Sequence, residues 1–203
     1  MLASVRVRLA VVASGLLLVG CTNQIGGNPG GGDSGTTPPV TSASTSSGSS
    51  SKVPPPVRPA VIKVDALDPC KALTVDQMNQ LGVAKNKRSD NDLVKKGDVP
   101  VCLYTPNPAR FSYEVGLIPN EGVGYWRKGS GNVDRKETQV SGFDAIRINL
   151  SGQSDACSFW VDVADGQMVY VNFLPIDDMT LDQVCEKAKK GTELALATLK
   201  TLA

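Results

Sequence analysis

Hydrophobic and polar residues alternate with a period of two through the middle of the chain, which predicts β-strands with one buried face. In one run, Phe111, Tyr113 and Val115 alternate with polar or small residues. The connections are too short for helical crossovers, so we expect an antiparallel sheet. An Asp-Gly pair at 165–166 predicts a two-residue type I′ hairpin between the last two strands. The pattern predicts about five strands, at 99–105, 110–118, 143–150, 156–164 and 167–174.

The period changes to that of a helix at both ends of this strand region. A short helix is predicted over 75–81, where Thr74 and Gln77 form a capping-box pattern and Gly82 ends the run. Residues 181–202 carry apolar side chains three or four apart, and a second capping-box pattern, Thr180 and Gln183, lies at the start of this run. We therefore expect a single two-layer α+β domain, with an antiparallel sheet packed against a short N-terminal helix and a long C-terminal helix.

Residues 1–20 have the three parts of a secretory signal, namely Arg6 and Arg8, an apolar run over 9–19 and a small-residue exit. The run is too short to span a bilayer. Leu18-Val19-Gly20-Cys21 reads as a lipobox, in which Cys21 receives a diacylglyceryl group and becomes the new N-terminus. The alternative is an ordinary cleaved signal that ends before Cys21 by chance. The lipobox predicts a protein anchored to the cell membrane on its extracytoplasmic side, with palmitate among the acyl chains.

Residues 21–60 form the expected tether. Between residues 22 and 60, Ser, Thr, Gly and Pro account for 27 of 39 positions. A segment with so few large apolar side chains cannot offset the entropy cost of ordering, so we expect a disordered spacer. Its hydroxyl-rich part could carry sugars or be a plain solvated linker; composition leaves both open. The folded domain is expected over 61–203.

Five cysteines occur in the sequence, and lipidation of Cys21 leaves four. In an exported chain these should form two disulfides, for which the sequence alone allows three connectivities. Cys157 shares a strand face with apolar residues, and Cys185 lies on the apolar stripe of the last helix, so both should point into the same layer. The pattern therefore favours Cys157 with Cys185 and, by exclusion, Cys70 with Cys102.

The order of these features resembles a known family. The lipobox and tether are followed by Asp68-Pro69-Cys70 before a Thr-capped helix, Cys102 in a strand, Cys157 opening a strand, and Cys185 in an Ala/Leu-rich helix. This order is similar to that of the actinobacterial lipoprotein family catalogued as domain of unknown function 3558. The resemblance covers the whole domain. It implies no catalytic residue, because that family is functionally uncharacterised.

The sequence contains no histidine, which removes Ser-His and Cys-His nucleophile pairs and imidazole metal sites. Asp177, Asp178 and Asp182 lack the spacing of a calcium loop and are read as acidic residues favoured by a helix N-terminus. We therefore expect no cofactor and no metal. The mature chain has 19 basic and 20 acidic residues, after Arg6 and Arg8 leave the 21 of the precursor. A net charge of 19 − 20 = −1 gives no reason to expect nucleic acid as a partner.

Tyr125-Trp126-Arg127-Lys128 lies in a long Gly-punctuated segment over 119–137. An aromatic and basic loop of this kind could meet a glycan, a lipid headgroup or an envelope protein. Alternatively, Trp126 folds back onto the core as a lid. The sequence thus favours a non-catalytic, lipid-anchored binding or assembly module of the cell envelope. A carrier of a small apolar ligand, and a cell-wall enzyme that uses carboxylates, remain as alternatives.

Overall fold

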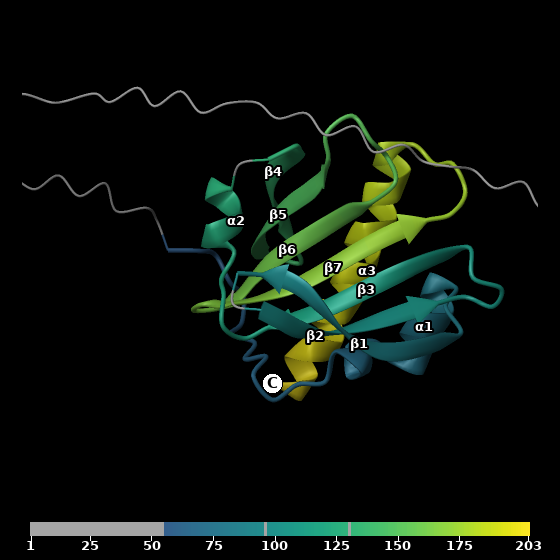
Figure 1. The fold of residues 1–203 in the computed structure, drawn as a ribbon. Helices are drawn as coiled ribbons and strands as arrows, with labels where there is room; N and C mark the ends of the chain where they lie inside the picture. Colours follow the sequence, from purple (N-terminus) through teal and green to yellow (C-terminus); the bar gives the residue numbers. More distant parts are fainter. Residues whose placement is uncertain (1–54, 96, 130) are drawn as a thin grey trace, which may run out of the picture. The chain divides into compact units, whose positions relative to one another are not determined.

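The structure, a computed structural model, describes residues 55–95, 97–129 and 131–203, which belong to one compact unit (Figure 1). The predicted signal, Cys21 and nearly all of the tether lie outside these residues. In chain order the elements are the 3-10 helix η1 (Pro69–Lys71), α1 (Val75–Leu81), β1 (Lys85–Val94), β2 (Gly97–Thr105), β3 (Phe111–Ile118), α2 (Gly124–Lys128), β4 (Val133–Val140), β5 (Phe143–Leu150), β6 (Cys157–Ala164), β7 (Gln167–Pro175) and α3 (Leu181–Leu202).

The strands form one antiparallel sheet in the order β1-β2-β3-β7-β6-β5-β4. Two meanders, β1 to β3 and β4 to β7, meet where β3 pairs with β7. The α+β class and the antiparallel sheet are confirmed, but the expected number of about five strands is wrong, because the sheet has seven.

The two strands that the sequence pattern missed are the outer ones, β1 and β4. Most of their side chains are exposed on both faces, so neither strand has a period-two apolar pattern. Charged side chains on edge strands also discourage pairing with other chains. The segment predicted as a loop over 119–137 contains α2 and the beginning of β4.

Helix α3 covers one face of the sheet, and Figure 1 shows it crossing behind β3, β6 and β7. The main core lies in this layer, together with η1 and α1. The helix approaches closely at Gly191, where an added Cβ would lie 2.7 Å from Cε1 of Tyr113. Tyr113 is itself buried against Phe173, with ring centroids 4.9 Å apart. The middle of the sheet–helix interface is therefore tightly packed.

The opposite face carries a second, smaller core. Trp160 and Tyr170 lie in its centre with their ring centroids 4.5 Å apart, and Ile146, Ile148 and Met168 surround them. The covering elements are α2 and the end of the β1–β2 hairpin, where Leu93 approaches Gly116. Central strands are thus buried on both faces, which explains why all eight residues of β6 are buried.

Both predicted capping boxes are present. Thr74 and Gln77 exchange hydrogen bonds at the start of α1, and Thr180 and Gln183 do so at the start of α3. Gly82 ends α1 in the left-handed conformation, with φ 72°.

The β6–β7 hairpin is present with Asp165 and Gly166 at its tip, but its turn is not type I′. Asp165 lacks the positive φ that this turn requires at both central residues, and a register shift precedes the tip. The two positive values occur instead in the β4–β5 hairpin, at Ser141 (φ 51°) and Gly142 (φ 82°).

Residues 57–60, expected within the tether, contact the sheet. The Val57 backbone N–H donates to Oδ2 of Asp144 at 2.8 Å, and the Asp144 N–H donates back to the Val57 carbonyl. Arg58 forms ion pairs with Asp162 and Asp165. Burial alone would raise the pKa of Asp144, but the Val57 and Gln139 hydrogen bonds and the nearby Arg127 and Arg58 hold this pKa below its ordinary value.

Candidate functional site

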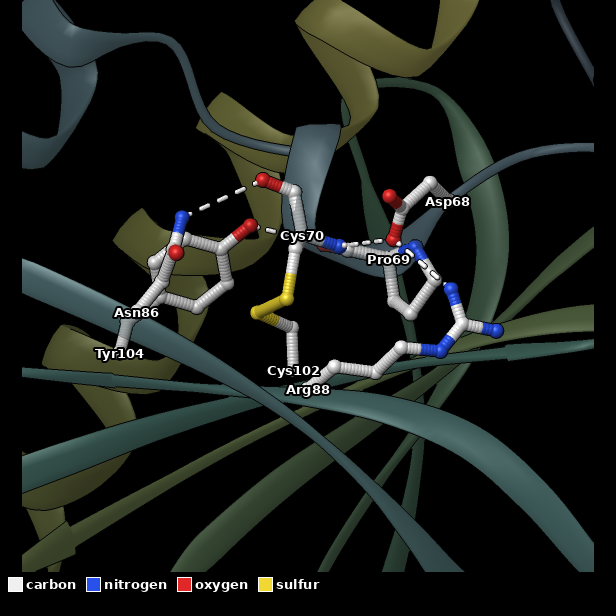
Figure 2. A network of polar contacts seen from close by, with 7 residues as sticks. All are labelled: Asp68, Pro69, Cys70, Asn86, Arg88, Cys102 and Tyr104. Carbon is white, nitrogen blue, oxygen red and sulfur yellow. Dashed lines mark hydrogen bonds and ion pairs between the residues drawn. A yellow bond between two sulfur atoms is a disulfide. The ribbon is translucent and has the colours of Figure 1, made fainter.

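The Asp68-Pro69-Cys70 turn is fixed to the β1–β2 hairpin by a polar network (Figure 2). Oδ1 of Asp68 accepts from the Cys70 N–H at 3.0 Å and pairs with Arg88 at 3.2 Å. The Tyr104 hydroxyl donates to the Pro69 carbonyl at 2.7 Å. Burial raises the pKa of Tyr104, so this hydroxyl stays protonated and able to donate.

The four strand residues of this network lie on one face of the hairpin. Arg88 is directly opposite Cys102, and Asn86 is directly opposite Tyr104. Asn86 donates to the Cys70 carbonyl at 3.3 Å, and the Cys70–Cys102 disulfide closes the arrangement. All of these interactions hold the turn in place, so we assign this region a structural role.

The second disulfide joins Cys157 at the start of β6 to Cys185 in α3. Both predicted disulfides are thus confirmed, with the pairing that the apolar pattern favoured. Cys157 and Cys185 are buried, and their link fixes the first half of α3 over the outer part of the sheet.

A pocket of about 270 Å³ opens beside Cys185, between α3 and strands β4 to β6. Its strand wall is a single row across three strands, because Lys136 lies directly opposite Arg147, and Arg147 directly opposite Phe159. Thr138 is the next residue of β4 on the same face. The helix wall consists of residues spaced three or four apart on one face of α3, namely Asp182, Cys185, Glu186 and Lys189.

The strand wall brings two like charges together. Lys136 is exposed and Arg147 is half-buried, and like charges directly opposite each other destabilise a strand pair. Neither side chain has a carboxylate within 4.0 Å in the described part of the chain. Nε of Arg147 is buried and finds no hydrogen-bond acceptor among those residues. This wall can therefore accept an anionic group.

The predicted binding loop, Tyr125 to Lys128, lies on the other side of the sheet. It forms α2, in which Trp126 stacks on Trp160 with ring centroids 4.2 Å apart. Arg127 pairs with Glu137 of β4 at 3.3 Å. Tyr125 is 41% exposed, and Nζ of Lys95 lies 5.3 Å from the centre of its ring. Trp126 thus occupies the lid position, and the exposed surface of α2 consists mainly of Tyr125 and Lys128.

A family model described as "Protein of unknown function (DUF3558)" matches residues 16–198. The chain belongs to this family. The resemblance read from the sequence is therefore confirmed, and the match includes every residue that lines the pocket. No curated protein and no solved structure shows a significant match to this DUF3558 chain.

The other sites considered for the DUF3558 chain lie outside this pocket. Cys21, the predicted lipid attachment, lies outside the described residues. Across residues 55–95, 97–129 and 131–203, no group of three or more His, Cys, Asp or Glu side chains is arranged to hold a metal ion. In those same stretches no helix is long and apolar enough to cross a membrane. Asp177 and Asp178 line a separate surface pocket with Asp155, and Asp177 pairs with Arg110 at 3.6 Å.

The pocket was missed by sequence reasoning because half of its strand wall comes from β4. Arg147 lies in a predicted strand, but it alternates, together with Asn149, with the apolar Ile146 and Ile148, so its face was expected to be the solvent-exposed one. The sequence of the last helix did contain an indication of the pocket. Asp182, Glu186 and Lys189 lie within four positions of Cys185, and the disulfide directs this part of the helix towards the sheet.

Proposed function

We propose that this DUF3558 protein is a lipid-anchored, extracytoplasmic binding module, and that its pocket binds a small ligand that carries an anionic group. The observation that supports this most is the unpaired strand wall. Lys136 and Arg147 lie side by side with no carboxylate between them, and Nε of Arg147 is buried without an acceptor. A carboxylate or phosphate bound there would remove the repulsion and supply the missing hydrogen bond.

The form of the pocket also supports a small ligand. A volume of about 270 Å³ lies just below the roughly 300–1,000 Å³ of pockets that hold drug-sized molecules. The buried ring of Phe159 and the adjacent Cys185 provide an apolar floor against which a ligand can pack. The charged residues give orientation, and the apolar floor gives contact area.

The lipid anchor is supported by the sequence, through the lipobox that ends at Cys21 and the Ser/Thr/Pro/Gly-rich segment after it. Two acyl chains hold a protein on a membrane without further contacts. To test the anchor, expressing cells are fed radioactive palmitate. We expect label in the wild-type protein and none in Cys21→Ala; a labelled Cys21→Ala protein would contradict the assignment.

The binding function is tested by calorimetry on the full-length protein in detergent, with benzoate and phenyl phosphate as probes and neutral benzamide as the control ligand. We expect at least one of the two anions to bind about tenfold or more tightly than benzamide, since a hydrogen bond to a charged group contributes about 1.5–3 kcal/mol. Arg147→Gln should abolish the difference. Lys187→Gln, a matched loss of one exposed positive charge outside the pocket lining, should preserve it.

Two results would overturn this function. One is equal affinity for benzamide and for both anions, and the other is an equal loss of anion binding in Arg147→Gln and Lys187→Gln. Either result would mean that the strand wall does not select charge.

The alternatives receive less support. A carrier of an apolar ligand needs an apolar hollow between sheet and helix. Gly191 and Tyr113 are in close contact in the middle of this interface, and the pocket at its outer part has charged side chains on both walls. Carboxylate catalysis of glycoside hydrolysis needs two acidic groups that flank the scissile bond. Asp182 and Glu186 instead lie on one wall, one helical turn apart.

A further inference from the structure

The helix wall of the pocket carries a pair of unpaired negative charges, whereas the strand wall carries a pair of unpaired positive charges. Asp182 and Glu186 lie at positions i and i+4 of α3, where two like charges destabilise a helix. Both are exposed, and neither has a basic group within 4.0 Å among the residues that the structure describes. Lys189, the one basic residue of this wall, pairs with Glu193 at 3.9 Å.

The two walls face each other without pairing. Lys136 and Arg147 contribute two positive charges on the strand side, and Asp182 and Glu186 contribute two negative charges on the helix side. A purely anionic ligand would meet repulsion from the helix wall. A purely cationic ligand would meet repulsion from the strand wall. A ligand that carries one charge of each sign, separated by a few atoms, satisfies both walls at once.

We infer that the ligand is a zwitterion of the amino acid or short-peptide class, with both termini free. Its carboxylate lies between Lys136 and Arg147, and its ammonium group lies between Asp182 and Glu186. The side chain of the ligand packs on Phe159. This inference rests on the proposed function, because it assumes that the strand wall binds an anion, and it adds a role for the helix wall.

The size of the pocket agrees with this class. A volume of about 270 Å³ accommodates one or two small residues rather than a long peptide. We expect the pocket to bind a peptide with both termini free much more tightly than a capped one. Capping one terminus leaves the two like charges of one pocket wall without a counter-charge.

The inference is tested with alanyl-alanine in three forms, titrated into the full-length protein in detergent. The free dipeptide should bind about tenfold or more tightly than either the N-acetylated or the C-amidated form, since each cap removes one charge-assisted contact. N-acetylation removes the ammonium group and tests the helix wall. C-amidation removes the carboxylate and tests the strand wall.

Two substitutions show which wall of the pocket binds which terminus of the dipeptide. Glu186→Gln should weaken binding of the free dipeptide about tenfold, because it removes one partner of the ammonium group. It should not weaken binding of the N-acetylated form, which has no ammonium group and is repelled by the Glu186 carboxylate. Lys136→Gln should weaken both forms, because both keep the carboxylate. Asp76→Asn removes an exposed carboxylate of α1 that is outside the pocket, and it should leave all affinities unchanged.

The outcomes separate the two proposals. If the N-acetylated dipeptide binds as tightly as the free one, the zwitterion inference fails while the anion site stands. If the C-amidated dipeptide binds as tightly as the free one, the strand wall does not bind the carboxylate and both fail. If no dipeptide binds although benzoate or phenyl phosphate does, the ligand class is wrong and the proposed function remains.

Discussion

The two faces of the sheet are stabilised in different ways. One face lies under α3, a helix of 22 residues that is linked to β6 by a disulfide and approaches Tyr113 at Gly191. The other face lies under α2, a helix of five residues whose main contact is the stacking of Trp126 on Trp160. The first face depends on many contacts along a long helix, whereas the second depends on a few aromatic rings.

This difference explains where a ligand site can form. A long straight helix cannot follow a twisted sheet along its full length, so the first half of α3 leaves space over the outer strands. The disulfide fixes the width of this space. The small core on the other face is filled largely by the stacked rings of Trp126, Trp160 and Tyr170.

Removal of the Cys157–Cys185 disulfide should have the largest effect on this comparison. The closed loop spans 28 residues, so the double Cys157→Ala and Cys185→Ala variant should lose about 3–4 kcal/mol of unfolding free energy. The loss is measured by urea denaturation of the full-length protein in detergent. A loss below about 1 kcal/mol would mean that α3 is held mainly by packing and not by the disulfide.

Truncation of Trp126 should have a smaller effect, confined to the second face. Trp126→Ala should lower the unfolding free energy by about 2 kcal/mol, because the residue loses its stacking on Trp160 and part of its buried area. Tyr125→Ala serves as the control, since Tyr125 is 41% exposed and should cost less than about 1 kcal/mol. Equal effects of the two variants would contradict the lid position of Trp126.

The smallest effect concerns Asp144, which joins the start of the domain to the second face. Its pKa is lowered in the folded protein, so its stabilising contribution is present above the unfolded value of about 3.8 and is lost as the pH falls towards the folded value. Asp144→Asn should therefore be slightly less stable than the wild type at pH 7. The difference should shrink as the pH falls below about 3.8. Urea midpoints between pH 7 and pH 2 test this, and a difference that does not change over this range would exclude ionisation as the cause.

The inner part of the fold could be predicted from the sequence because buried positions recur as a regular pattern of apolar residues. The strands near Val115, Ile148 and Val171, both capping boxes and the disulfide pairing follow from apolar positions and from the chemistry of a few polar residues. The outer strands β1 and β4 have no such pattern of apolar residues. Their pairing depends on backbone hydrogen bonds to β2 and β5, and it requires no periodic apolar pattern in β1 and β4 themselves.

The candidate site could be predicted only in part for the same reason. Cys185 placed the first turns of α3 against the sheet, but the partner of Arg147 is Lys136 of β4, and that neighbour becomes visible only with the register. The sequence left open whether Trp126 is a lid on the core or a contact residue of a binding loop. Trp126 lies on the core because it stacks on Trp160, a strand residue more than 30 positions away in the chain, and local sequence does not reveal that contact.

The attachment of Val57 and Arg58 has a mechanical consequence. A pull on the N-terminal side of the domain, as from a membrane tether, reaches the sheet first through the paired hydrogen bonds between Val57 and Asp144 and through the ion pairs of Arg58 with Asp162 and Asp165. Force is thereby divided between β5 and the β6–β7 hairpin. The strand wall of the pocket shares β5 and β6 with these contacts, but Lys136, Arg147 and Phe159 are not among the residues that hold Val57 and Arg58. Tension would therefore open the entry segment before it changed the shape of the pocket.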